Sequence, residues 1–222
     1  WRDGGRLHPG AGVPPEVSAR SFFRVALPTE APVPVQARML GELAARLEQV
    51  EPEAGLVLVG HSAGGVVARF AMVERPGLPW KALVTIASPH LGTRAAELGA
   101  MAGATPLAWA APFLGGGTLN RSQWLYRDLA RARPGSLLYW LNHQPHPEAV
   151  YVSIVRRDDG GLDLGELVVP QESQSLQRVA ALDGEAVRIV HGRDHGLAPG
   201  DGELLAEVLG RLGAGDVRPA AE

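Results

Sequence analysis

The segment from Leu56 to Val67, LVLVGHSAGGVV, decides the predicted fold of this 222-residue chain. Its first four residues are apolar and lie between Gly55 and Gly60, a pattern typical of a strand that is buried on both faces of a parallel sheet. The residues from about Ser62 to Arg75 then suit a helix, which Pro76-Gly77 ends.

The turn between this strand and this helix, Gly60-His61-Ser62-Ala63-Gly64, matches the pattern G-x-S-x-G. Such a turn holds a serine hydroxyl in a strained, exposed position, where it can act as a nucleophile. Because the pattern is short, its place between a strand and a helix carries the prediction. The competing interpretation is a glycine-rich turn with an idle serine, and we favour Ser62 as the nucleophile.

The rest of the chain alternates strands with helices. We expect strands over 22–27, 82–87, 150–155 and 187–190, and helices over 35–50, 123–131, 173–181 and 203–212. This alternation predicts an α/β fold with a parallel sheet that helices cover on both sides. Ligands of such sheets bind at the carboxyl ends of the strands, where Ser62 lies.

A nucleophilic serine needs a base, and in this architecture the order along the chain is serine, acid, histidine. His195 follows the last expected strand and precedes the last helix, so we predict that it is the base. His191 lies nearer the strand and is predicted to be structural. We expect the side chain of His61 to point away from the turn, and His90 to line the cleft.

The acid that orients the base should lie in the loop after the strand at 150–155. Glu166 is favoured by its spacing, because Glu166-Leu167-Val168-Val169-Pro170 leads directly into the next helix. Asp163 and Asp159 are favoured by residue type, and all three remain open as the acid.

Composition excludes several classes of site. The net charge is −3 and no cluster of Lys or Arg is visible, which argues against binding nucleic acid. The chain has no cysteine, so disulfides, thiolate metal sites and thiol nucleophiles are excluded. No signal peptide is visible, and we expect a soluble protein, cytoplasmic or secreted.

One uncharged stretch, Leu98 to Asn120, is long enough to suggest a membrane span. Pro106, Pro112 and the triplet at 115–117 weaken or break a helix, so a spanning helix is not expected. We expect an apolar, mobile insertion on the surface instead.

Two segments carry a family resemblance. The segment at 59–69, VGHSAGGVVAR, resembles the nucleophile region of α/β-hydrolase lipases, and the segment at 85–93, TIASPHLGT, resembles the one after their next strand. The segment at 22–25 with the Gln36 helix, Gly160-Gly161 and Asp194-His195 look most like the GPI inositol-deacylase-like branch.

This resemblance implies a single α/β-hydrolase domain over 1–222, with a lid or cap inserted at about 97–146. It also implies a serine hydrolase of lipid or other acyl esters that uses neither a metal nor a cofactor. The lid could contact a membrane surface transiently.

The roles that follow are nucleophile for Ser62, base for His195 and orienting acid for Glu166, with Asp163 or Asp159 as alternatives. The backbone N–H of Ala63 would bind the oxyanion. The residues expected to contact the substrate are His61, His90 and Leu91.

The chain departs from the family at two places. The family usually has Asp where Glu166 stands. It also has a strand ending in a His-Gly-type loop, which supplies the first oxyanion donor, and no apolar strand precedes Phe22 here. We expect that strand to lie upstream of Trp1, with residues 1–5 as the remains of its loop.

Two other functions remain open. One is an acyltransferase or thioesterase on the same triad. The other is a catalytically inactive module that holds a lipid or a partner in an apolar cleft. The order of serine, acid and histidine favours the ester hydrolase.

Overall fold

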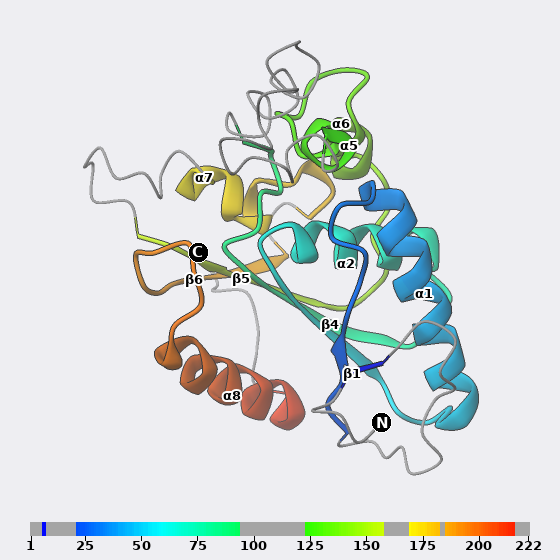
Figure 1. Cartoon of the computed structure of the whole chain (residues 1–222). Helices are drawn as coiled ribbons and strands as arrows, with labels where there is room; N and C mark the ends of the chain where they lie inside the picture. The colour runs from blue at the N-terminus through cyan, green and yellow to red at the C-terminus, as the bar shows by residue number, and fades with distance from the viewer. Residues whose placement is uncertain (1–5, 8–20, 94–122, 158–168, 183–184, 216–222) are drawn as a thin grey trace.

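The computed structural model describes residues 6–7, 21–93, 123–157, 169–182 and 185–215 (Figure 1). Its main sheet has four strands in the order β3-β4-β5-β6, and every neighbouring pair is parallel. The strands are β3 (Leu56–His61), β4 (Trp80–Ile86), β5 (Val150–Val155) and β6 (Ala186–Val190). The predicted parallel α/β fold is confirmed, and the carboxyl ends of all four strands lie at one edge.

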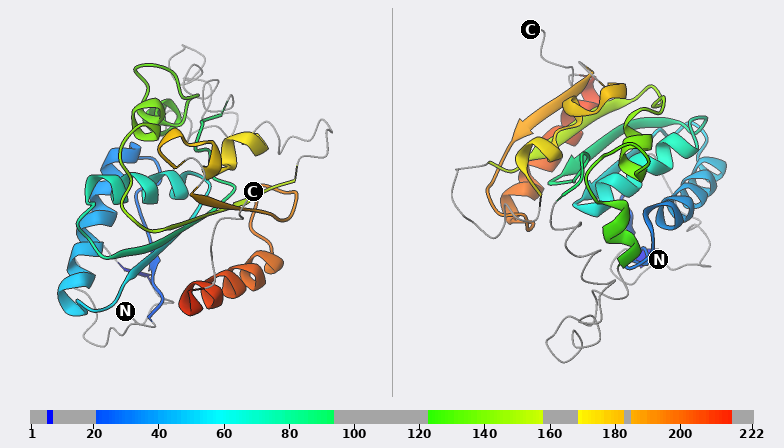
Figure 2. Two further views of the ribbon diagram at one scale, coloured as in Figure 1. Left: turned by 180° about the vertical axis from the view of Figure 1, so that it is seen from behind. Right: turned by 90° about the horizontal axis from the view of Figure 1, so that it is seen from above.

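Helices cover both faces of this sheet (Figure 2). On one face, α1 (Val33–Val50) and α2 (Ala63–Glu74) contribute most of the larger core, which includes the fully buried side chains of Val33, Ala37, Val66 and Met72. On the other face, α8 (Pro199–Ala214) places Val208 against Val84, Ile86, Val152 and Ile154 of β4 and β5.

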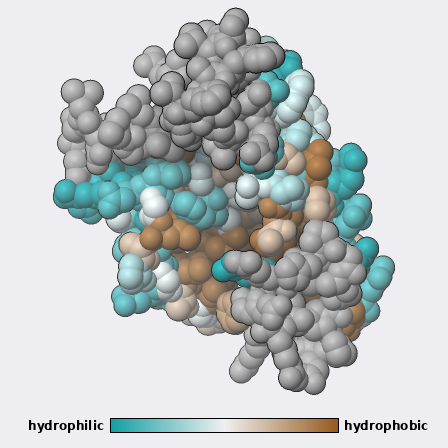
Figure 3. All heavy atoms as spheres, viewed as in Figure 1, coloured by the Kyte–Doolittle hydropathy of each residue, from teal (hydrophilic) through white to brown (hydrophobic). Residues whose placement is uncertain are grey.

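The prediction that the strand at Leu56 is buried on both faces is wrong. Val57 is 40% exposed and Val59 is 44% exposed, while Leu56 and Leu58 on the opposite face pack against the larger core. The core beneath α8 contains residues of β4, β5 and β6 and none of β3, so this helix leaves one face of β3 uncovered. Figure 3 shows hydrophobic side chains gathered on this side of the molecule.

The N-terminal strands are shorter than expected. β2 contains only Arg24–Val25, against the predicted 22–27, and it pairs in parallel with β1 (Arg6–Leu7). These two strands form a separate sheet. A short strand therefore does precede Phe22, although its sequence is not apolar enough to identify it.

The predicted helix at 173–181 is replaced by three short pieces. They are α7 (Gln171–Gln174) and two 3₁₀ helices, η3 (Leu176–Arg178) and η4 (Ala180–Leu182). Ser175 and Val179 have extended backbone angles, which interrupt the helical hydrogen bonds. The last helix begins earlier than predicted because Pro199 suits its first position.

The expected insertion at about 97–146 lies partly outside the described residues, which resume at Gln123. The described part contains α5 (Gln123–Asp128) and α6 (Leu137–Asn142), next to the carboxyl end of the sheet (Figure 1). Within the described ranges, no helix is both long and apolar enough to cross a membrane. The uncharged stretch from Leu98 to Asn120 lies outside those ranges.

Candidate active site

The turn from β3 into α2 holds Ser62 in a strained conformation. Its backbone angles are φ 53° and ψ −131°, in the positive-φ region that residues other than glycine seldom adopt. The N–H of Ser62 donates to the carbonyl of Ile86 at 2.9 Å, which ties the turn to the end of β4. The serine is only partly buried.

Two glycines allow the close packing behind this turn. A Cβ atom on Gly60 would lie 2.5 Å from the backbone of Gly65, and one on Gly65 would lie 2.1 Å from Oγ of Ser88. Gly64 differs, because an added Cβ there would meet no described atom within 4 Å. Close packing therefore requires glycine at position 60, the first of the motif, and at position 65, directly after the motif.

The structure brings Ser62 and His195 together. Nε2 of His195 lies 3.0 Å from Oγ of Ser62, although 133 positions separate the two residues in the sequence. With the proton of the imidazole on Nδ1, Nε2 accepts a hydrogen bond from the serine hydroxyl. This is the geometry that a general base needs in order to remove the hydroxyl proton.

The surroundings of His195 favour its neutral form. Burial lowers the pKa of His195 below its ordinary value of about 6.5, and the nearby His61 and Arg156 lower it further. At neutral pH the imidazole is therefore free to accept a proton.

The sequence led us to expect that the side chain of His61 points away from the turn, and this prediction is wrong. Its Nε2 lies 2.8 Å from the carbonyl oxygen of His195, and the two rings are 5.2 Å apart. The residue before the serine thus contacts the backbone of the base. Its predicted contact with substrate stays a prediction.

His90 does not line an open cleft, because its side chain is fully buried. Nε2 of His90 lies 3.1 Å from Oγ1 of Thr85, and the side chain of Asn142 donates to its carbonyl. Leu91 is partly buried, and its N–H donates to the backbone and side-chain oxygens of Ser173. A contact of Leu91 with substrate stays a prediction.

A buried polar group next to His90 was not anticipated. Arg69 of α2 is fully buried, and its Nη2 donates to the side chain of Asn142. Within the described residues, Nε and Nη1 of Arg69 have no acceptor, and burial lowers its pKa to about 9. The lone charge in the apolar run VVARFAMV at 66–73 was the available signal.

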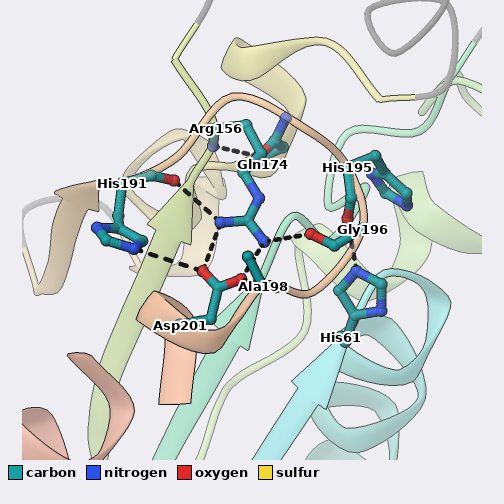
Figure 4. Close-up of polar contacts among 8 residues, drawn as sticks. All are labelled: His61, Arg156, Gln174, His191, His195, Gly196, Ala198 and Asp201. Atoms are coloured by element: carbon teal, nitrogen blue, oxygen red, sulfur yellow. Dashed lines mark hydrogen bonds and ion pairs between the residues drawn. The ribbon is translucent and has the colours of Figure 1, made fainter. Parts of the chain in front are cut away.

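A second buried cation, Arg156, was also not anticipated. It directly follows β5, is 4% exposed and pairs with Asp201 of α8 at 2.6 Å. Its other bonds reach the loop that carries His195 (Figure 4). In the sequence, an arginine that follows a strand cannot be distinguished from a charged residue of a solvent-exposed loop. The sequence therefore offered no signal for this ion pair.

The three candidate acids, Glu166, Asp163 and Asp159, lie outside the described residues, so the choice among them stays a prediction. Ala63 is the first residue of α2, and its N–H has no acceptor within the helix, as at any helix start. Its role as oxyanion donor also stays a prediction. The described part of the chain holds no group of three or more side chains suited to a metal ion.

Comparisons with known proteins agree with this architecture. The model of the PGAP1-like alpha/beta domain family matches residues 35–100. Bacillus licheniformis lipase BlEst2 superposes with a TM-score of 0.56, at 18% identity over 82% of this chain and 74% of that one. No curated protein matches the sequence significantly.

Two further solved structures are similar. The product of gene lin2722 from Listeria innocua gives a TM-score of 0.54, at 15% identity over 81% of this chain and 67% of that one. The metagenomic carboxyl esterase MGS0156 gives 0.51, at 20% identity over 78% and 54%. The chain has the α/β-hydrolase fold. The predicted family resemblance is confirmed over residues 35–100, which match the model of the PGAP1-like alpha/beta domain.

Proposed function

We propose that this protein is a serine hydrolase that cleaves carboxylic esters through an acyl-enzyme intermediate. The observation that carries the proposal is the 3.0 Å contact between Oγ of Ser62 and Nε2 of His195, with Ser62 at a strained strand-to-helix turn. The likeness to lipases and esterases supports an ester hydrolase as the class of enzyme.

In the first half of the reaction, Oγ of Ser62 attacks the ester carbonyl carbon while Nε2 of His195 takes the hydroxyl proton. The carbonyl oxygen becomes an oxyanion, which the N–H of Ala63 stabilises. The bond between the carbonyl carbon and the alcohol oxygen then breaks, and the alcohol leaves with the proton from His195.

In the second half, His195 takes a proton from water, and the resulting nucleophile attacks the acyl group on Ser62. Collapse of this second tetrahedral intermediate releases the acid and returns the proton to Ser62. A carboxylate at Glu166, Asp163 or Asp159 holds His195 in the tautomer with its proton on Nδ1.

The substrate class that we propose is a lipid or another acyl ester. Three large aromatic side chains of the described insertion are exposed: Trp124 of α5 by 52%, and Tyr139 and Trp140 of α6 by 38% and 43%. We propose that the insertion at about 97–146 acts as a lid and that these three rings offer an apolar surface to an acyl chain. The same rings could contact a membrane surface transiently.

A fluorophosphonate probe tests the proposal, because it forms a covalent bond only with an activated serine. We expect the wild-type protein and Ser88→Ala to react, since Ser88 is buried behind the turn, and we expect Ser62→Ala not to react. Equal labelling of the wild type and Ser62→Ala would exclude the hydrolase and favour an inactive binding module. Release of an ester when an alcohol acceptor is added would instead indicate an acyltransferase.

A further inference from the structure

We propose that Arg156 is the positioning residue of the base: it holds the loop of His195 against Ser62 through its ion pair with Asp201 and through bonds to the carbonyls of His191 and Gly196. This inference rests on the proposed function and concerns two residues that do not touch the reacting atoms.

The guanidinium of Arg156 lies at the centre of this network (Figure 4). Nη1 donates to the carbonyl of His191 at 3.0 Å and to Oδ1 of Asp201 at 2.6 Å. Nη2 donates to the carbonyl of Gly196 at 2.9 Å and to Oδ2 of Asp201 at 3.0 Å. One planar group thus binds both ends of the segment 191–196, and His195 lies inside that segment.

Asp201 anchors the cation to a rigid element. It is 3% exposed, and its Oδ2 also accepts the N–H of Ala198 at 2.7 Å, in the first turn of α8. The bond from Arg156 lowers the pKa of Asp201, so this carboxylate is charged at neutral pH. The loop is therefore fixed between the end of β5 and the start of α8.

The loop has little structure of its own. Between β6 and α8 its backbone bonds reach other elements: the N–H of His191 donates to Val155, and the carbonyl of Gly192 accepts from Arg157. The carbonyl of His195 faces His61 on the other side. Because the loop depends on outside donors, loss of Arg156 removes two of the bonds that fix the position of the imidazole.

Gly192 gives the guanidinium room to pack under the loop. Its φ is +70°, and an added Cβ would lie 2.9 Å from Nη1 of Arg156. A guanidinium is needed at this place because it presents parallel donors in one plane, whereas the ammonium group of a lysine is a single point of charge. We therefore expect lysine to replace the charge of Arg156 without replacing its function.

The test compares Arg156→Lys, Arg156→Gln and Asp201→Asn with the wild type, using hydrolysis of p-nitrophenyl butyrate. We expect kcat to fall about a hundredfold in Arg156→Gln while KM stays within about twofold, because the base is misplaced and the substrate site is intact. Arg156→Lys and Asp201→Asn should show the same split between kcat and KM. A wild-type kcat in Arg156→Lys would overturn the inference.

The pH profile separates the charge of Arg156 from its geometry. Burial is the largest cause of the lowered pKa of His195, and among the described charged and titratable groups near the base, which include His61, His191, Asp201 and Arg156, it is His61 and Arg156 that lower this pKa further. The candidate acids Glu166, Asp163 and Asp159 lie outside the described residues. The acidic limb of kcat/KM should therefore move to higher pH in Arg156→Gln and stay at its wild-type position in Arg156→Lys. An unchanged limb in Arg156→Gln would contradict this placement of the cation.

Three further variants guard against a simple loss of folding. Arg156→Gln/Asp201→Asn removes both buried charges together and so avoids an unpaired one; its kcat should still fall. Arg178→Gln breaks the exposed pair with Glu172 and should keep the wild-type kcat. Leu40→Ala weakens the larger core at α1, outside the insertion and the loop of His195, and its folded fraction should also keep that kcat.

Failure of this inference differs from failure of the proposed function. A wild type that neither reacts with the fluorophosphonate nor hydrolyses the ester contradicts the proposed function. In that case, amide hydrogen exchange over residues 191–198 still tests whether Arg156 holds the loop of His195 in place. Faster exchange there in Arg156→Gln than in Arg178→Gln supports the positioning role, and equal exchange rejects it.

Discussion

The imidazole of His61 lies 2.8 Å from the carbonyl oxygen of His195, so the residue before the serine supports the backbone of the residue that faces the serine. The same short turn thus carries Ser62 and contacts the backbone of His195, the two partners of the 3.0 Å contact. Because His61 ends β3 and Ser62 follows it directly, a shift at this end of β3 would move the serine and the support of the base together.

Replacing His61 with Phe tests this support. The phenyl ring can keep the packing on His195 but cannot donate the hydrogen bond. A bond of this kind contributes about 0.5–1.5 kcal/mol, so we expect kcat to fall by about two- to tenfold. Steady-state kinetics of His61→Phe beside the wild type measures the loss. Equal kcat values in the two proteins would contradict the role of His61.

Ser62→Gly should make the protein more stable and inactive. The positive φ of Ser62 costs about 1–3 kcal/mol, and glycine relieves this cost at an entropic penalty of about 0.5–1 kcal/mol. We expect a net gain of about 1 kcal/mol in the free energy of urea unfolding. Ser62→Ala keeps the strain and should unfold like the wild type; if it gains as much as Ser62→Gly, the strain is not at this residue.

The two neighbouring glycines should respond differently to alanine. In Gly65→Ala the new Cβ would meet Oγ of Ser88, and we expect a loss of about 1–3 kcal/mol in unfolding free energy. Gly64→Ala meets no described atom and should change stability by less than about 1 kcal/mol. Urea denaturation measures both. Adding Ser88→Ala should recover part of the loss at position 65, and no recovery would place the clash elsewhere.

Stability should fall in acid because of His146. Burial, followed by the charge of Arg69, lowers the pKa of His146 to about 4. The unfolded chain, with a histidine pKa of about 6.5, binds the proton first, so unfolding free energy decreases as pH falls from about 6.5 to about 4. The slope from one such group is at most about 1.4 kcal/mol per pH unit.

His146→Phe should flatten this part of the stability profile. Urea unfolding across the same pH window measures the difference between the two proteins. The pKa of His90 is also lowered by burial, so some acid sensitivity remains in the variant. Parallel profiles for the wild type and His146→Phe would show that His146 does not titrate in this way.

The features that the sequence predicted well are local or depend on order along the chain. The apolar run before Gly60 and the helix after Ser62 are both encoded by neighbouring residues, and the position of His195 followed from its place after the last strand. The paired contact of Arg156 and Asp201 spans 45 positions and joins two elements on different sides of the loop. No local pattern distinguishes such an arginine from one in solvent.

Burial was predicted less well than secondary structure, for a related reason. Whether Val57 and Val59 are covered depends on where α8 lies across the sheet, and the apolar run itself carries no such information. The sequence predicted that His90 lines the cleft, yet its ring faces Thr85 in the interior. The direction in which a side chain points after a strand depends on how the neighbouring helices pack, which the sequence pattern does not give.

The position of β3 also affects how separate molecules of this protein interact. Within the described residues β3 pairs only with β4, so the N–H and C=O groups along its other side have no strand partner, and Val57 and Val59 lie on the same strand. An edge of this kind is a template for pairing with a strand of another molecule. Self-association that rises with protein concentration, and that falls when Val57 is changed to Lys, is the solution behaviour that this edge predicts.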